Sequence, residues 1–159
     1  MKELISKLSS YNLFNYLLPG ALFVFICRYL ELLKATESNI VLEFFVYYFA
    51  GMTISRVGSL IVEPLFKRIK LVSYAEYPEY LDACKRDDKI EILLEQNNVY
   101  RTIVALFFSV LPLQLAVAYG VPNELLTGAL LISVFILYVL AYRKQTSYIR
   151  QRVEKNKNR

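Results

Sequence analysis

The stretch GMTISRVGSLIVEP, residues 51–64, places an arginine and a glutamate inside an apolar run long enough to belong to a membrane span. A charged side chain at the centre of a bilayer costs roughly 3 kcal/mol on insertion scales. We therefore expect Arg56 and Glu63 to face the interior of a helix bundle, a water-filled cavity or a partner. The alternative is that Arg56 extends its side chain to the headgroups and that Glu63 lies in the interface.

One face of the same stretch carries several small residues, and we call it the thin face. On a helix, Ser59 and Glu63 follow Arg56 at three and seven residues and share its face. Gly51, Ser55 and Ser59 recur at intervals of four, and small residues at that spacing let a second helix approach closely. We predict that this face makes the polar contacts of an oligomer or lines its pore, through Arg56, Ser59, Glu63, Gly51, Ser55 and Gly58.

The composition indicates a membrane protein. Of the 159 residues, 56% are hydrophobic, and the apolar residues come in long unpatterned blocks rather than with the polar faces of a soluble helical bundle. A span needs about 20 apolar residues. Four blocks qualify, at residues 13–33, 40–66, 99–119 and 125–142. The predicted fold is a single all-α domain over residues 1–159, an integral membrane four-helix bundle with a short cytoplasmic helical hairpin between spans two and three.

Basic residues predict the orientation. Most of the 19 Lys and Arg residues lie near the amino terminus, in the loop 67–98 and in the tail 143–159, and such residues stay on the cytoplasmic side. We expect a bacterial inner-membrane protein with both termini cytoplasmic and with its first span retained. The tail has seven basic residues and one acidic residue, a charge of +6, whereas the rest of the chain has −1, and we expect the tail to contact lipid headgroups rather than nucleic acid. Its predicted contacts are Arg143, Lys144, Arg150 and Arg152.

The loop 67–98 has two helix signals. Pro78 suits the first turn of a helix that runs to about residue 85, and Asp88 with Glu91 has the spacing of a capping box for a second helix, residues 89–96. Tyrosines recur at every third position and could form a surface for a partner, or could simply pack the hairpin against the headgroup layer. The predicted docking residues are Tyr74, Tyr77, Tyr80, Asp88 and Glu91.

The residue types argue against catalysis. The chain has no histidine, which removes the commonest general base and metal ligand. Cys27 and Cys84 have no metal-binding spacing and fall on opposite sides of the predicted membrane, so no disulfide is expected. Helix capping and solvation account for the loop carboxylates. We predict no catalytic residue, no metal, no cofactor and no enzyme activity.

Two segments carry a resemblance. ISRVGSLIVEP (residues 54–64) and, after a charged loop, DDKIEILLEQNNVYRT (residues 87–102) resemble a group of small bacterial four-span membrane proteins, some of which occur beside anti-phage defence components. The resemblance covers residues 51–102. It implies a membrane-resident effector, sensor or accessory subunit, and it transfers no catalytic residue.

These observations favour a homo-oligomeric inner-membrane effector, pore-forming or membrane-perturbing, or the membrane subunit of a defence or stress complex with a cytoplasmic protein partner. A small channel or transporter is an alternative, although the two halves of the chain show no related pattern of the kind that transporter repeats have. A passive scaffold that anchors a cytoplasmic partner is the third reading. An intramembrane enzyme that acts on lipid ranks last.

Overall fold

The computed structural model describes residues 10–34 and 39–157, and all regular structure in these ranges is helical. The all-α prediction is therefore confirmed for the described chain. A π-helical turn, η1 (Gly58–Val62), joins α3 to α4 without a break. The helices are α2 (Ser10–Tyr29), α3 (Ile40–Val57), α4 (Glu63–Arg68), α5 (Tyr77–Ala83), α6 (Lys89–Ala118) and α7 (Asn123–Lys157).

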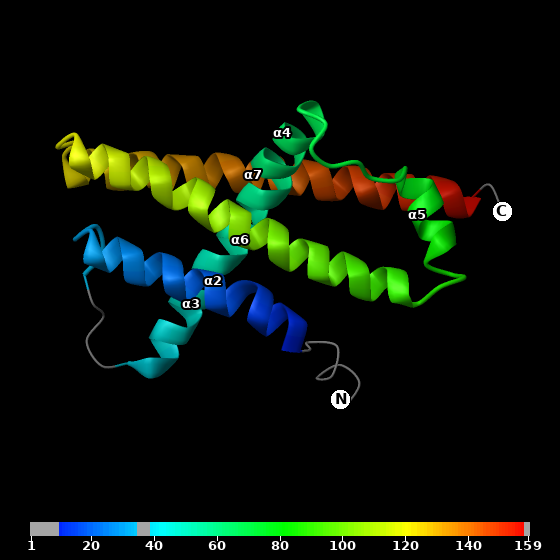
Figure 1. Cartoon of the computed structure of the whole chain (residues 1–159), viewed down its shortest axis with the longest axis horizontal. Helices are drawn as coiled ribbons and strands as arrows, with labels where there is room; N and C mark the ends of the chain where they lie inside the picture. The colour runs from blue at the N-terminus through cyan, green and yellow to red at the C-terminus, as the bar shows by residue number, and fades with distance from the viewer. Residues whose placement is uncertain (1–9, 35–38, 158–159) are drawn as a thin grey trace.

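Three helical segments of the described chain are long and apolar enough to cross a membrane: Ile40–Arg68, Lys89–Ala118 and Asn123–Lys155. They contain the predicted spans two, three and four. The predicted first span, residues 13–33, corresponds to α2, which ends at Tyr29, four residues early, and Glu31 then takes a left-handed backbone conformation with φ 58°. In Figure 1, α2, α6 and α7 run lengthwise, and the α3–η1–α4 rod crosses them obliquely.

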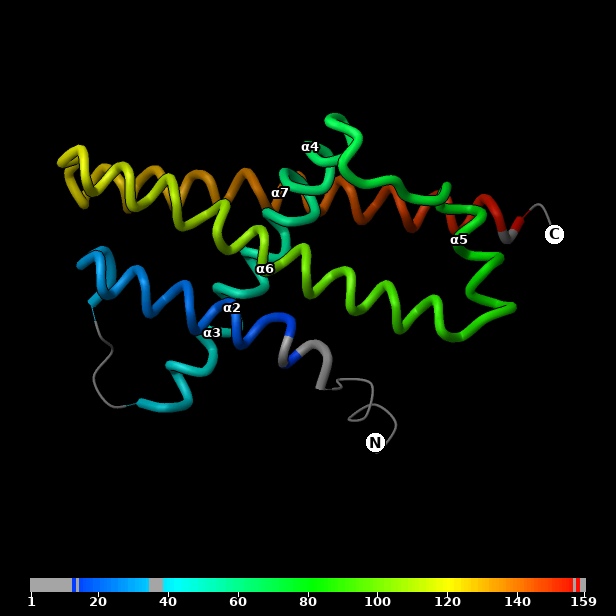
Figure 2. Tube along the Cα trace, in the orientation of Figure 1, coloured from blue at the N-terminus to red at the C-terminus, as the bar shows by residue number. Residues whose placement is uncertain are grey.

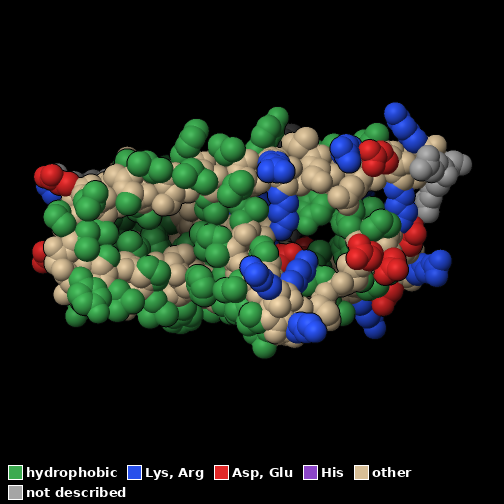
Figure 3. Space-filling view, turned by 90° about the horizontal axis from the view of Figure 1, so that it is seen from above, with side chains coloured by type: hydrophobic (Ala, Val, Ile, Leu, Met, Phe, Trp, Pro, Cys, Tyr) green, Lys and Arg blue, Asp and Glu red, His purple; other side chains and the backbone are tan. Residues whose placement is uncertain are grey.

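The long helices separate an apolar half from a polar half. Figure 3 shows hydrophobic side chains over one half of the molecule, whereas Lys, Arg, Asp and Glu gather over the other half, apart from a few at the far apolar end. Large side chains such as Phe25, Phe107 and Phe135 are more than half exposed on the apolar half. Such surface is costly in water and suits contact with lipid or with another protein.

Two helices are longer than predicted. α6 runs without interruption from Lys89 to Ala118, so the second helix of the predicted hairpin and the predicted third span are two parts of one helix, and a separate hairpin is not confirmed. Asn97 and Asn98 lie within this helix, since asparagine has only a weak preference against helix. α7 likewise continues through the tail to Lys157.

The predicted capping box at the start of α6 is wrong. The backbone of Asp88 is helical, with φ −65° and ψ −18°, whereas a capping residue needs an extended backbone. Asp88 therefore makes no side-chain cap, and its predecessor Asp87 accepts the Lys89 N–H over 2.9 Å instead. The predicted helix at Pro78 does form, as α5, with proline in its first turn.

The tightest packing lies where α2 crosses α3. A Cβ atom added to Gly20 would overlap the carbonyl oxygen of Tyr47, and one added to Gly51 would overlap that of Tyr16. Glycine on both helices therefore lets the two backbones touch. Nearby, Thr102 of α6 is fully buried and its hydroxyl lies 3.0 Å from the side-chain amide of Asn15, a polar contact that links α2 to α6.

After α4 the chain turns back toward α5. Figure 2 shows this segment leading from the end of α4 to α5, near the C-terminus of the chain. The ring of Tyr77 in α5 lies 5.0 Å from that of Tyr148 in α7, and Lys155 of α7 donates to the carbonyl of Pro78 and pairs with Asp82 over 2.8 Å. We call residues 69–98 and 145–157 together the polar end.

Candidate functional site

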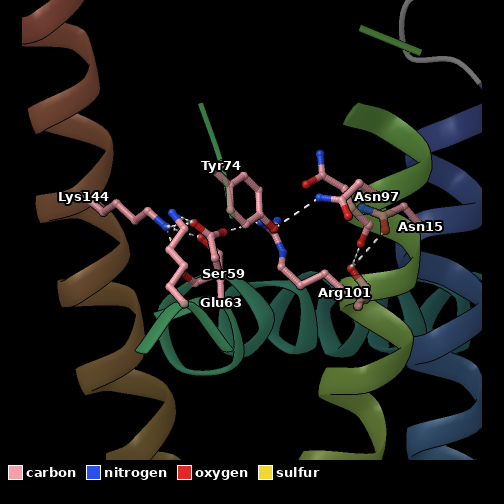
Figure 4. Close-up of polar contacts among 10 residues, drawn as sticks. Asn15, Ser59, Glu63, Tyr74, Asn97, Arg101 and Lys144 are labelled. Carbon is pink, nitrogen blue, oxygen red and sulfur yellow. Dashed lines mark hydrogen bonds and ion pairs between the residues drawn. The ribbon is translucent and has the colours of Figure 1, made fainter. Parts of the chain in front are cut away.

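The Glu63 carboxylate is the centre of a charge cluster at the junction of the apolar half and the polar end. Arg101 of α6 donates to its Oε2 over 2.6 Å, and Lys67, one turn later in α4, donates to its Oε1 over 3.0 Å. Lys144 of α7 lies 3.9 Å from Oε1. The Glu63 side chain is only 10% exposed. One carboxylate thus connects three helices, as Figure 4 shows.

The π-helical turn explains why Lys144 reaches into this cluster. The Glu63 N–H bonds to the carbonyl of Gly58, and the next residue, Pro64, has no N–H. The carbonyl of Ser59 therefore lacks a donor from its own helix. The Lys144 ammonium supplies one over 2.8 Å and also donates to Ser59 Oγ over 2.9 Å. Lys144 therefore binds Ser59 and lies beside Glu63, two residues that were predicted to share a helix face.

Gly58 has no side chain and therefore leaves space for Arg101 to pack against it. A Cβ added at Gly58 would lie 3.2 Å from Arg101 Cγ and 3.3 Å from its carbonyl oxygen, both tighter than ordinary contacts. The Nε of Arg101 is buried and has no hydrogen-bond partner among the described residues. The guanidinium is therefore held through its Nη1 bond to Glu63, and the thin face of the π turn allows α6 to come close enough to make that bond.

Arg56 does not join the Glu63 carboxylate. It lines a small cavity, about 30 Å³, between α3–η1 and α7, together with Ser59, Leu60, Ala141, Lys144, Gln145 and Tyr148. Sequence position alone puts Arg56 well inside the second span. Because the α3 rod is oblique, Arg56 instead lies beside the part of α7 where its apolar run ends and its basic residues begin.

The remaining residues of the predicted thin face, Gly51 and Ser55, are buried within the chain. Gly51 contacts the backbone of Tyr16 in α2, and Ser55 is buried. The six predicted residues therefore divide between the α2 crossing, the Glu63 cluster and the Arg56 cavity. They do not form one stripe. Arg56 directly follows Ser55 and so points about 100° away from it, and the extra residue of the π turn rotates Glu63, which follows the turn, by about 100°.

The loop tyrosines pack against the chain's own helices. The Tyr74 hydroxyl accepts from Asn97 over 3.2 Å, and the Lys67 ammonium lies 4.3 Å from the centre of the Tyr74 ring. Tyr77 stacks on Tyr80 at 6.3 Å. Burial raises the pKa of the Tyr80 hydroxyl, and its hydrogen bond with Cys84 adds to the increase. Tyr80 is therefore neutral at physiological pH.

An open groove of about 460 Å³ lies beside these tyrosines. Apolar residues of α6 form one wall and the loop forms the other. Asp88 and Glu91, the other predicted docking residues, are exposed at the start of α6 and do not line the groove. The lining residues are Val72, Ser73, Tyr74, Ala75, Tyr80, Ile90, Leu93, Leu94 and Asn97.

The four predicted headgroup residues of α7 differ in orientation. Arg143, Arg150 and Arg152 are exposed, and Arg150 pairs with Glu154 one turn later over 3.2 Å. Lys144 is half-buried and turns inward to Ser59. The residues of these polar contacts that were not predicted as site residues include Lys67, Arg101, Asn15 and Thr102. For Arg101 a signal existed, since a glutamate in a span requires a cation and Arg101 is the basic residue at the edge of the next span.

The charged groups of the site interact through ion pairs and hydrogen bonds. Cys27 is buried and Cys84 is half-buried, and both are free thiols. Among residues 10–34 and 39–157, no three His, Cys, Asp or Glu side chains gather in a way that could hold a metal ion. The arrangement of Glu63 with its cations can hold three helices together and can attract further anions.

Comparison with known proteins does not assign the chain to a family. The resemblance to small four-span membrane proteins of defence systems therefore stays a prediction. Protein-family models, curated proteins and solved structures were all compared with the chain, and none of them matches it.

Proposed function

We propose that the chain is a four-span protein of the bacterial inner membrane with both termini cytoplasmic, and that it acts as a homo-oligomeric effector or as the membrane subunit of a defence or stress complex. The observation that carries this proposal is the Glu63 cluster, which joins α4, α6 and α7 where the apolar half meets the polar end. Its effect would be to open or perturb the membrane.

The continuity of α6 and α7 supports coupling between the two halves. Each helix runs unbroken from the polar end into the apolar half. A partner or trigger that moves the polar end would therefore displace the membrane parts of the same helices. The Glu63 contacts to Arg101 and Lys144 set their position against the α3 rod, so a change at this cluster would alter the packing of the apolar half.

The exposure of α7 supports assembly. Only 6% of the residues in its apolar stretch are buried, against 22% in the apolar stretch of α6. Lipid can cover such a surface, but a helix that contributes little to the fold of its own chain is well placed to contact a second copy. Homo-oligomers commonly use one self-complementary surface.

The test is the membrane potential of cells, read with a voltage-sensitive dye after induced expression at matched membrane levels. We expect the wild type to collapse the potential and Glu63→Gln to leave it intact. Glu154→Gln, which removes an exposed carboxylate of the same helix bundle, should behave as the wild type does. A normal potential with the wild type, together with a monomeric mass in detergent, would contradict the effector role.

The groove favours one second candidate, a scaffold that anchors a cytoplasmic partner. Its apolar wall includes Leu93, which is 61% exposed. In this case Leu93→Glu should abolish co-purification of the partner, while neither it nor Glu63→Gln should change the membrane potential. Loss of the dye response in Glu63→Gln alone would count against the scaffold.

A further inference from the structure

Positively charged side chains line the cavity beside Arg56, and the described chain supplies no acceptor for the Arg56 guanidinium. Among the described residues, the Arg56 guanidinium makes no hydrogen bond and no ion pair, although Arg56 forms one wall of the cavity. Lys144 forms part of the opposite wall and donates two hydrogen bonds to Ser59, which leaves one of its three N–H groups for another acceptor. Two cations from two helices thus face the same small space.

The neighbouring carboxylate balances only part of this charge, because three cations share it and Arg56 is not one of them. Glu63 is already bound by Arg101 and Lys67, and it lies 3.9 Å from Lys144. No acidic residue lines the Arg56 cavity. A cation in a partly apolar site loses hydration, and the loss is offset only when an anion or a strong acceptor pairs with it. The site therefore favours an anionic ligand.

Its position indicates where such an anion would come from. Ala141, on the cavity wall, belongs to the last apolar turn of α7, and Arg143 and Lys144 follow directly. The change from apolar to basic residues marks the level of the headgroups, where the cytoplasmic leaflet presents anionic phosphates.

We propose that this cavity binds the phosphate group of an anionic phospholipid, with Arg56 and Lys144 as its cationic contacts and with Gln145 and Tyr148 as hydrogen-bond donors. A volume of about 30 Å³ accepts one phosphate oxygen and leaves the rest of the headgroup at the mouth of the cavity. This proposal rests on the placement in the membrane and not on the effector role. Lipid binding without any dye response would support the lipid site and contradict the effector role.

The test is native mass spectrometry of the full chain in a non-ionic detergent with equal amounts of phosphatidylglycerol and phosphatidylcholine. The wild type should retain one phosphatidylglycerol per chain in preference to phosphatidylcholine. Arg56→Gln should weaken that binding about tenfold, as expected for one charge-assisted contact. Arg143→Gln is the matched control, because Arg143 lies at the same level of α7 but is exposed and outside the cavity, and it should keep the lipid.

A second variant separates binding from folding. Gln145→Glu places a carboxylate at the cavity wall on an exposed helix position, so it should repel the phosphate while circular dichroism stays that of the wild type. Equal retention of both lipids by the wild type would overturn the proposal. So would an equal loss in Arg56→Gln and Arg143→Gln, since that pattern describes a general basic surface. Displacement of the lipid by millimolar inorganic phosphate would assign the site to free phosphate and reject the lipid headgroup.

Discussion

Glu63 and Arg101 are 38 residues apart in the chain, yet their side chains meet over 2.6 Å, and this contact fastens the end of the α3 rod to α6. The pair is largely shielded from water, with side-chain exposures of 10% and 18%. It lies directly after the π-helical turn, whose glycine makes room for Arg101. The geometry of the junction between the apolar half and the polar end therefore depends on this pair.

Removal of the Glu63 charge should destabilise the fold. Glu63→Gln leaves Arg101 and Lys144 without their counter-charge, and the loss of one partner of a shielded ion pair costs about 3 kcal/mol. Unfolding in detergent, followed by circular dichroism, measures the change. Glu154→Gln should have little effect because its pair with Arg150 is exposed. Equal stability of Glu63→Gln and the wild type would refute the structural role of the cluster.

The crossing of α2 and α3 should not tolerate a methyl group. Gly20→Ala and Gly51→Ala each place a Cβ onto the backbone of the facing helix, so each should lower the free energy of unfolding by about 2 kcal/mol through overpacking. Gly128→Ala is the control. Nothing lies within 4 Å of a Cβ at Gly128, so its greater helix propensity should leave stability unchanged or slightly raised. Identical stability of all three variants would argue against the close crossing.

Lys155 should hold α5 against α7. Its ammonium pairs with Asp82 and donates to the carbonyl of Pro78, both in α5. Lys155→Gln should therefore raise the hydrogen-exchange rate of α5 amides about fivefold, which corresponds to about 1 kcal/mol for a partly exposed pair. Lys157→Gln, at an exposed position of the same last turn, should leave α5 protected. A loss of protection in both variants would point to charge in general rather than to this contact.

The two thiols should report the orientation. A membrane-impermeant maleimide should label Cys84 in inverted membrane vesicles and not in intact cells, because the polar end is expected to be cytoplasmic. Cys27 is 2% exposed and should stay unlabelled in both. Cys84→Ala should abolish the signal. Labelling of Cys84 in intact cells would reverse the proposed topology.

Much of the apolar framework was predictable because it depends on local composition. The second predicted span, residues 40–66, agrees with Ile40–Arg68, and the Pro78 helix forms as α5. The ends of α6 and α7 were harder to place, since both helices continue through polar residues that the sequence pattern assigns to a loop and a tail. Tertiary contacts such as Asn97 to Tyr74 and Thr102 to Asn15 help to fix the path of α6 there.

The sequence by itself determined that this chain is helical, that its apolar blocks suit a membrane, and that Arg56 and Glu63 need polar surroundings, because these properties follow from residue type and spacing. Only the tertiary structure decided what surrounds each of these two side chains. The π turn rotates Glu63 toward Arg101, and the oblique α3 rod brings Arg56 to the polar boundary of α7. Neither the rotation nor the inclination follows from a regular α-helical period. For this reason Arg56 and Glu63, although they belong to one predicted span, lie in two different surroundings.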